Sequence, residues 1–292
     1  MYYAGIDGGQ SATRAVVCGD DGAVLGSGRA GPADEIGATP QSTRLRDALE
    51  TALRNAVLDA GLPVGQQFAA IVAGISGYEG RVAGVAPQLP SRRAVLMHDA
   101  PIAHAGALAG EPGIVVIAGT GSVAYCVDSS GRAEQFGGWG YLFGDEGSAF
   151  WIACEAITNV ARHPGCDAVD AILTFFEARS LRELVSAFYL GEISRERLAA
   201  FAPSCIADAR DATTSCACLR DPARRAPDEL AKLASLGVTD TLRTVAFVGG
   251  LMRDAWLKER TYLALQKRVA GVSIVEPLYE PALGALLIAR RL

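Results

Sequence analysis

Apolar residues at the start of the chain come in short runs that glycine-rich turns separate. Residues 2–17 form two such runs around the turn Gly8-Gly9-Gln10-Ser11, and residues 23–29 form a third after a turn that ends in Asp-Gly. Asp-Gly supplies the left-handed backbone conformation that a tight hairpin needs. The pattern therefore predicts three consecutive strands joined by hairpin turns.

Helical and strand patterns alternate in the segments that follow. Apolar residues at helical spacing form one stripe between residues 39 and 61. Beyond it we expect a strand at 68–73, a short helix at 78–86, a strand at 94–97 and a helix at 100–109. The predicted order of this part of the chain is β-β-β-α-β-α-β-α.

The same order begins again after residue 112. Strands are expected at 114–118, 123–127 and 133–136, followed much later by strand, helix, strand and helix at 244–248, 254–269, 272–275 and 281–292. Valine and isoleucine runs in these strands do not alternate with polar residues, which is typical of parallel strands that crossover helices bury on both faces. A single doubly wound domain without duplication is the alternative, since plain β-α-β series are more common than β-β-β-α repeats.

A long segment inside the second half, residues 146–237, is helical in pattern throughout. We therefore predict an α/β protein with two domains, residues 1–112 and 113–292. Both are built on one duplicated βββαβαβα unit, and the second carries a helical insertion at about 146–237.

Composition agrees with two domains and restricts the partners. The chain has 292 residues, of which 50% are hydrophobic, and a formal net charge of −5. Nucleic acids and anionic membranes need a basic face, and no Lys/Arg-rich run is present. The first residues lack a signal-peptide pattern, and no apolar run approaches the ~20 residues that span a bilayer. We expect a cytoplasmic protein with a small-molecule partner and without a nucleic-acid or membrane partner.

The seven cysteines show no framework spacing, and their odd number leaves at least one thiol unpaired. Free thiols in the core or at the surface are therefore expected. Cys216-Ala217-Cys218 could ligate a metal, but the three histidines, His98, His104 and His163, stand at no finger-like spacing from it.

Two glycine-rich hairpin turns match each other in position and chemistry. The first is Gly5-Ile6-Asp7-Gly8-Gly9, and the second is Ala118-Gly119-Thr120-Gly121-Ser122. Glycines let backbone N–H groups approach an anion, and hydroxyl groups add further donors. A dinucleotide-binding motif would need a helix directly after the second turn, where a strand is expected instead, and no P-loop motif is present. We expect the two turns to hold one polyphosphate.

Two aspartates stand at the ends of predicted strands. Asp7 would hold Mg²⁺ opposite a polyphosphate, through water, unless it only caps local backbone amides. Asp99 follows the strand at 94–97, at the carboxyl end where α/β proteins bind ligands. Its alternative role is to cap the helix at 100–109.

Two further glycine-rich segments are poor core elements. Residues 137–148 read Gly-Gly-Trp-Gly-Tyr-Leu-Phe-Gly-Asp-Glu-Gly-Ser, and such a loop costs so much backbone entropy that it is typical of a ligand surface. Asp145 in this run could accept hydrogen bonds from sugar hydroxyls or cap the helix that follows. Gly249-Gly250 after the strand at 244–248 would admit a flat adenine or ribose, or simply make a tight turn.

Together these motifs resemble the sugar kinase, Hsp70 and actin superfamily, and within it the N-acetylglucosamine kinase branch of the BadF/BadG/BcrA/BcrD ATPase family. The run at 137–148 is the most family-specific piece, and the resemblance covers essentially the whole chain. It implies two ribonuclease H-like (actin-like ATPase) domains, with ATP and Mg²⁺ as cofactors. It also implies a kinase that phosphorylates the 6-hydroxyl of N-acetylglucosamine or a close relative.

The resemblance assigns a role to each candidate residue. Asp99 would be the catalytic base that accepts the proton of the sugar hydroxyl, and Asp7 would carry the metal. Donors to the phosphates would be Gly8, Gly9, Gln10, Ser11 and Thr13 from the first domain and Gly119, Thr120, Gly121 and Ser122 from the second. The sugar would be bound by Asp34, Ser76, Gly77, Asp99, Gly138, Trp139 and Asp145, and the adenosine by Gly249 and Gly250.

Two departures from the family pattern leave the substrate open. Gln10-Ser11 replaces a Gly-Thr pair in the first turn, which changes the phosphate donors but keeps a hydroxyl. Asp34 stands where many relatives carry an Asn that helps to hold the sugar. Because a carboxylate lacks an amide donor and adds negative charge, it favours a cationic amine, and glucosamine is the alternative substrate.

A different class of protein in the same family is also considered, the ATPase that activates 2-hydroxyacyl-CoA dehydratases. Those activators hold an iron–sulfur cluster on cysteines and carry an Asp-Ile-Gly-Gly-Gln-Asp run in the second hairpin, which this chain lacks. A homodimer is the expected assembly, because symmetric dimers are the commonest oligomers.

Overall fold

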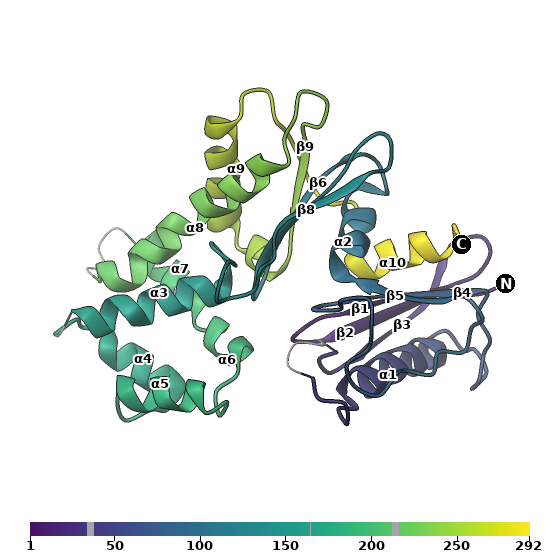
Figure 1. The fold of residues 1–292 in the computed structure, drawn as a ribbon, viewed down its shortest axis with the longest axis horizontal. Coiled ribbons are helices and arrows are strands. Elements are labelled where there is room, and N and C mark those ends of the chain that lie inside the picture. The colour runs from purple at the N-terminus through teal and green to yellow at the C-terminus, as the bar shows by residue number, and fades with distance from the viewer. Residues whose placement is uncertain (34–37, 164, 212–215) are drawn as a thin grey trace. The chain divides into compact units, whose positions relative to one another are not determined.

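The computed structural model describes residues 1–33, 38–163, 165–211 and 216–292. Contacts divide the chain into two compact units (Figure 1). Unit 1 comprises Met1–Val115, Tyr125–Arg132 and Glu276–Leu292, and unit 2 comprises Val116–Ala124 and Ala133–Val275. The C-terminal segment, which we predicted within the second domain, thus packs with unit 1.

Unit 1 is built on a sheet of five strands in the order β3-β2-β1-β4-β5. The strands β1, β2 and β3 form an antiparallel meander, whereas β4 and β5 run parallel to β1. In this register Gly8 pairs with Ile75, and Ile75 pairs with His98, so the carboxyl ends of three parallel strands meet at one edge. The strands are β1 (Tyr3–Gly8), β2 (Thr13–Cys18), β3 (Val24–Ala30), β4 (Ala70–Ile75) and β5 (Ala94–His98).

Helices cover both faces of this sheet (Figure 1). The helix α1 (Arg44–Asp59) lies on one face and buries the leucine stripe that the sequence predicts. On the other face lie α2 (Asp99–Leu108) and α10 (Pro281–Ala289), which contact each other as well as the sheet. The two helices approach closely, since a Cβ on Gly284 would lie 1.9 Å from the carbonyl oxygen of Ile102.

The short helix predicted at 78–86 is wrong. Bends and irregular backbone occupy this segment, between β4 and β5. Gly77 and Gly80 adopt φ angles of 75° and 85°, and such left-handed residues end a helical hydrogen-bond pattern before a full turn forms.

The second sheet repeats the first in its strand order, β10-β9-β6-β7-β8. Matching β6 to β1 and continuing along the chain superimposes this order on that of the first sheet, which confirms the predicted duplication. Its strands are β6 (Gly113–Ala118), β7 (Ser122–Val127), β8 (Ala133–Gly137), β9 (Thr244–Val248) and β10 (Ser273–Val275). A short 3₁₀ helix, η1 (Gly250–Arg253), and α9 (Ala255–Arg268) connect β9 to β10.

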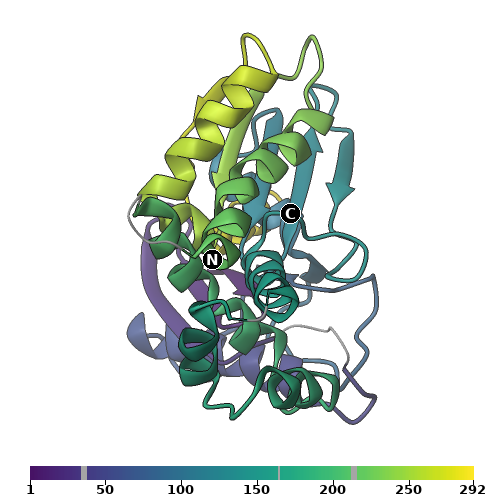
Figure 2. The same ribbon diagram turned by 90° about the vertical axis from the view of Figure 1, so that its left-hand side faces the viewer.

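The segment between β8 and β9 is helical, as the sequence predicts. It contains α3 (Ala149–Arg162), α4 (Ala168–Phe176), α5 (Leu181–Tyr189), α6 (Arg195–Ala199), α7 (Ala202–Arg210) and α8 (Ala217–Leu236). Serine side chains cap three of them, because Ser148, Ser180 and Ser194 each accept a backbone N–H of the first turn. Helices α8 and α9 pack side by side, as the turned view shows (Figure 2). Across the described ranges, no helix has both the length and the apolarity to cross a membrane.

Candidate functional site

The first glycine-rich turn connects β1 to β2 and rests on the turn after β4. The Gly9 N–H donates to the carbonyl of Ala12 at 3.0 Å, which closes the turn. The Ser76 N–H donates to the carbonyl of Gly8 at 2.9 Å, which ties the turn to the Ser76-Gly77 pair. The structure thus brings together two of the predicted segments of unit 1.

The side-chain amide of Gln10, in this turn, is only partly hydrogen-bonded. Its Nε2 donates to the Ser76 hydroxyl at 3.3 Å, while its Oε1 is buried without a hydrogen-bond partner. Exchanging the amide oxygen and nitrogen leaves the other atom unpaired, so one end of the amide lacks a partner in either orientation. An unpaired buried polar group is costly, and a ligand or an ordered water bound at this turn would satisfy it.

The two hydroxyl groups of the turn differ in their availability. Ser11 is exposed, whereas Thr13 is fully buried and donates to the carbonyl of Gly31 at 2.7 Å. The Thr13 hydroxyl therefore fixes the chain that follows β3 rather than standing free as a donor. The predicted sugar residue Asp34 lies outside the described residues.

Asp7 and Asp99 are close enough to influence each other electrostatically. Burial, and after it the negative charge of Asp99, raises the pKa of Asp7 from 3.8 to about 7, although the positive charge of Arg14 acts in the opposite direction. Arg14 is itself paired with Glu280 of the same unit. Two carboxylates that repel each other at a strand edge are hard oxygen donors of the kind that Mg²⁺ prefers, and a cation beside them would relieve the repulsion. The residues present therefore fit a magnesium ion.

The helix that begins at Asp99 is capped by its neighbour. His98 is the N-cap of α2, and its Nδ1 lies 3.2 Å from the Ala100 N–H, which donates to it. The same Nδ1 lies 2.9 Å from Oδ1 of Asp99, and this hydrogen bond raises the pKa of His98. One nitrogen cannot accept from Ala100 and donate to Asp99 at once, so protonation decides between the two contacts. The capping role that we considered for Asp99 thus belongs to His98.

Hydrogen bonds with the segment 145–150 hold the second glycine-rich turn, which lies in unit 2. The Ser122 N–H donates to Oδ1 of Asp145 at 3.0 Å, and the Ser122 hydroxyl donates to the carbonyl of Glu146 at 2.9 Å. The first N–H groups of α3 donate to the carbonyls of Gly119 and Thr120, at 2.9 and 3.2 Å. The hydroxyl of Ser122 is therefore occupied within the protein, unlike the role predicted for it.

Asp145 anchors this arrangement with the help of a residue that sequence reasoning missed. It is buried, with a left-handed φ of 64°, and its Oδ2 lies 3.1 Å from a guanidinium nitrogen of Arg195. Burial raises the pKa of Asp145, while the Ser122 N–H and the charge of Arg195 lower it. Arg195 also stacks over the ring of Tyr141, at 4.6 Å, and its Nε is buried without a partner. No local motif marks Arg195, because it lies on α6, far along the chain from Asp145.

The loop at 137–147 exposes aromatic and apolar side chains. Gly137, Gly138 and Gly140 have φ angles of 68–74°, so the loop turns in a way that β-carbons would oppose. Trp139 is 76% exposed, and Phe143 beyond it is 82% exposed. The predicted sugar residues Gly138 and Trp139 are therefore both exposed on this loop of unit 2.

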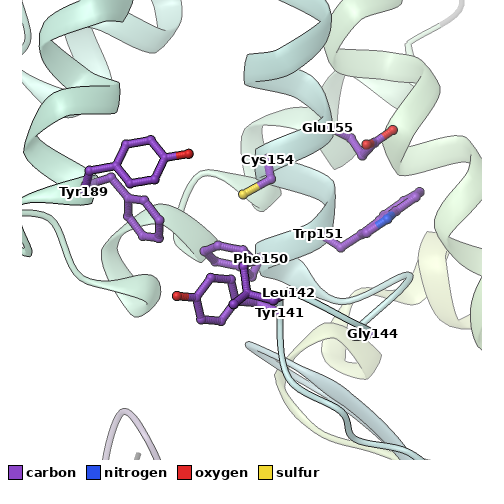
Figure 3. Close-up of a pocket in the computed structure, with 9 residues that line it drawn as sticks. Tyr141, Leu142, Gly144, Phe150, Trp151, Cys154, Glu155 and Tyr189 are labelled. Atoms are coloured by element: carbon purple, nitrogen blue, oxygen red, sulfur yellow. The ribbon is translucent and has the colours of Figure 1, made fainter. Parts of the chain in front are cut away.

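A separate hollow of about 410 Å³ lies beside this loop, between α3 and α5. Figure 3 shows Tyr141 next to Phe150, Tyr189 across from them, and the Cys154 sulfur directed toward the space between. Burial raises the pKa of Cys154 to about 12, so this thiol is uncharged at neutral pH. None of the predicted sugar residues of unit 2, Gly138, Trp139 and Asp145, lines this hollow. Its walls are Tyr141, Leu142, Gly144, Phe150, Trp151, Cys154, Glu155, Phe188 and Tyr189.

The glycine pair after β9 lies against the end of β6. Gly249 has a φ of 105°, and a Cβ there would lie 2.3 Å from the carbonyl oxygen of Ala118. A Cβ on Gly250 would meet open space. The pair predicted for adenosine is therefore adjacent to the turn predicted for phosphate. Gly249 permits this close approach, and Gly250 leaves open space beside it.

Comparisons with known proteins agree with this arrangement. The model of the BadF/BadG/BcrA/BcrD ATPase family matches residues 4–289. Over 110 residues the chain is 34% identical to the N-acetylmuramic acid/N-acetylglucosamine kinase of Clostridium acetobutylicum. That alignment spans only about a third of the curated relative, 36% of its length and 36% of this chain.

Two solved structures cover the chain from end to end. A Chromobacterium violaceum protein assigned as an N-acetylglucosamine kinase is 27% identical, with a TM-score of 0.81 and coverage of 99% of this chain and 98% of that one. A Porphyromonas gingivalis protein with the same assignment is 20% identical over 100% and 99% of the two chains, with a TM-score of 0.74, and shows the fold alone. The repeated sheet order and these likenesses establish the predicted pair of ribonuclease H-like, actin-like ATPase domains. The chain belongs to the BadF/BadG/BcrA/BcrD ATPase family.

Proposed function

We propose that this protein is an ATP-dependent amino-sugar kinase that phosphorylates the 6-hydroxyl of N-acetylglucosamine or a close relative. The observation that carries the proposal is that buried Asp7 feels the charge of Asp99, beside a glycine-rich turn in which Gln10 keeps an unpaired polar atom. A carboxylate pair of this kind suits one metal-holding and one base-forming aspartate. The family membership and the kinase names of two relatives support the same reading.

In the proposed reaction, Asp99 accepts the proton of the attacking hydroxyl and orients its oxygen toward the γ-phosphate. Phosphoryl transfer depends on positioning and on charge stabilisation rather than on covalent chemistry by the protein. Asp7 would hold Mg²⁺, which neutralises charge on the phosphates when bound. Backbone N–H groups of the two turns and the amide of Gln10 would bind the phosphate oxygens.

The hydrogen bonds within each unit leave fewer hydroxyl groups available to the phosphates than the sequence predicts. Thr13 and Ser122 already donate to carbonyl groups within their own units, whereas Ser11 is exposed and Thr120 uses only its backbone carbonyl in such a contact. We therefore assign direct phosphate donation to Ser11 and Thr120, and turn stabilisation to Thr13 and Ser122.

For the sugar, we propose contacts from the Trp139 loop of unit 2 and contacts from the Ser76-Gly77 turn of unit 1. Asp145 would contribute through the loop geometry that it fixes, because both of its carboxylate oxygens already accept hydrogen bonds. The identity of the 2-substituent, acetamide or free amine, depends in our proposal on Asp34. N-Acetylglucosamine and glucosamine are therefore the two substrates to compare first.

A substrate panel tests this function. N-Acetylglucosamine, glucosamine, glucose, N-acetylmannosamine and N-acetylmuramic acid are incubated with ATP and Mg²⁺, and ADP release is coupled to a spectrophotometric assay. We expect one amino sugar to be preferred, with the phosphate found on its 6-oxygen by NMR. The Asp99→Asn protein, purified in parallel, excludes a contaminating kinase. ATP turnover that no sugar accelerates would contradict the proposal.

A further inference from the structure

Three cysteine thiols that are distant in sequence meet in the helical insertion. The sulfur atoms of Cys166, Cys216 and Cys218 all lie within 4.8 Å of one another, and those of Cys166 and Cys216 are 2.9 Å apart. In the described part of the chain, they are the one group of three or more cysteine, histidine or acidic side chains this close together. The sequence shows only the Cys216-Ala217-Cys218 pair, so the third member comes from the fold.

The three residues belong to two segments that the fold holds against each other. Cys166 lies between α3 and α4, and its N–H donates to the carbonyl of His163 at 3.1 Å. Cys216 is the N-cap of α8, and Cys218 is in the first turn of that helix. None of these residues has a role in the proposed kinase reaction.

The three cysteines form no disulfide in the structure, and their spacing suits a metal. All three cysteines are free, and the 2.9 Å between the sulfurs of Cys166 and Cys216 is well beyond a disulfide bond of ~2.05 Å. Zinc–sulfur bonds of ~2.3 Å place the sulfurs of a tetrahedral site roughly 3.8 Å apart. A small outward rotation of these two thiols, within the 4.8 Å cluster, would reach that separation.

The position of the cluster also suits an ion that arrives from solvent. All three side chains are partly rather than fully buried, which leaves a path for an ion and room for one further ligand. Thiolates bind metals by replacing their protons, and soft sulfur ligands select Zn²⁺ and Cu(I) over Mg²⁺ or Ca²⁺.

We propose that Cys166, Cys216 and Cys218 form a three-thiolate site for a soft d¹⁰ cation, with Zn²⁺ as its occupant. Such an ion would tie the beginning of α8 to the connection between α3 and α4. Because ligands from separate segments converge only in the folded chain, binding would stabilise the insertion at the expense of the unfolded state. This site is independent of the magnesium site at Asp7.

The test is a zinc titration of the full-length protein, reduced and freed of metal by a chelator. Bound zinc is counted by elemental analysis after gel filtration, and Co²⁺ is used as a spectroscopic probe. We expect about one ion per chain and a sulfur-to-cobalt charge-transfer band. The single variants Cys166→Ser, Cys216→Ser and Cys218→Ser should each weaken binding by roughly 10- to 100-fold or more, since even outer-shell changes cost that much.

Cys154→Ser is the matched control, because Cys154 is a partly buried thiol of the same insertion outside the cluster, and it should bind as the parent does. Circular dichroism of each variant identifies one that fails to fold, and the cobalt spectrum of the parent protein tests thiolate ligation without any variant. An absence of bound metal, or binding that survives all three substitutions, would overturn the proposal. So would a metal-free protein whose mass falls by two hydrogens through a Cys166–Cys216 disulfide.

Discussion

Arg195 and Asp145 form an ion pair across 3.1 Å, with side chains that are only 13% and 6% exposed. Asp145 in turn accepts a hydrogen bond from the N–H of Ser122. Arg195 therefore supports the second glycine-rich turn indirectly, through Asp145. Loss of one partner from a buried pair leaves an uncompensated charge, which costs more than the pair itself contributes.

Replacing Arg195 by Met should therefore destabilise unit 2 by about 3–5 kcal/mol in urea unfolding. The double variant Arg195→Met, Asp145→Asn should recover much of this loss, because the amide oxygen still accepts from Ser122 without a buried charge. Arg197→Met, on the same helix but away from Asp145, serves as the control. Equal losses in the single and double variants would show that the charge of Asp145 is not the cause.

Asp99→Asn tests the proposed base. The amide keeps the size of the side chain but cannot take a proton, so kcat should fall by roughly 10²–10⁴. ATP binding, followed by titration calorimetry, should change little. A kcat close to that of the parent enzyme, in the coupled ADP assay with the preferred sugar, would refute the role of Asp99.

Asp7→Asn should have opposite effects on stability and on metal-dependent binding. The pKa of Asp7 is raised from 3.8 to about 7, so the folded protein binds a proton more tightly than the unfolded chain does. This contribution to stability is present in full below pH 3.8 and is lost as the pH rises through about 7. Above neutral pH, without metal, the variant should be the more stable protein, by on the order of 4 kcal/mol at most.

Magnesium should invert that order. Thermal unfolding at about pH 8 is measured with and without Mg²⁺ and ATP, because a ligand that binds only the folded state raises its stability. The parent should gain stability from the mixture, and Asp7→Asn should lose most of the gain. If Mg²⁺ and ATP stabilise both proteins equally, Asp7 does not hold the metal.

His98→Asn probes the contact between His98 and Asp99. Because the pKa of His98 is raised from 6.5, its stabilising effect is complete below that pH and is lost as the pH rises through the higher value in the folded protein. Asn still caps α2 but does not titrate, so the variant should lose less stability than the parent as the pH rises above 6.5. Asp99→Asn should flatten the same pH dependence. Identical pH profiles for the parent and both variants would contradict the contact.

Local patterns were sufficient for most of the fold. Alternation, turn chemistry and helical spacing predict the strands and the helical insertion, because neighbours in the chain decide those features. The short helix at 78–86 failed since glycine conformation outweighed the apolar pattern. Long-range partners could not be predicted: Arg195 meets Asp145 across 50 residues, and Cys166 meets Cys216 across the same separation.

The candidate site shows the same limit. Its glycines and aspartates were visible because turns and strand ends carry them in recognisable order. The hydrogen bonds of individual hydroxyls were not, since the carbonyl that occupies Thr13 belongs to Gly31 on another strand connection, and the cap of α2 falls on His98 rather than Asp99. The sequence motif shows which donor groups are present. Which of them remain available to a ligand depends on the packing of the folded chain.

The helix α10 is synthesised near the end of the chain, although it packs on the sheet of unit 1. Its buried face, Ala282, Ala285, Leu286 and Ala289, covers the first sheet on the side opposite α1. A ribosome makes the strands of that sheet first and this helix only after all of unit 2. At roughly 5–20 residues per second, α2 alone covers this face for many seconds, and the part that α10 will bury stays exposed. Although its strands are made first, unit 1 is therefore the later of the two units to be completed.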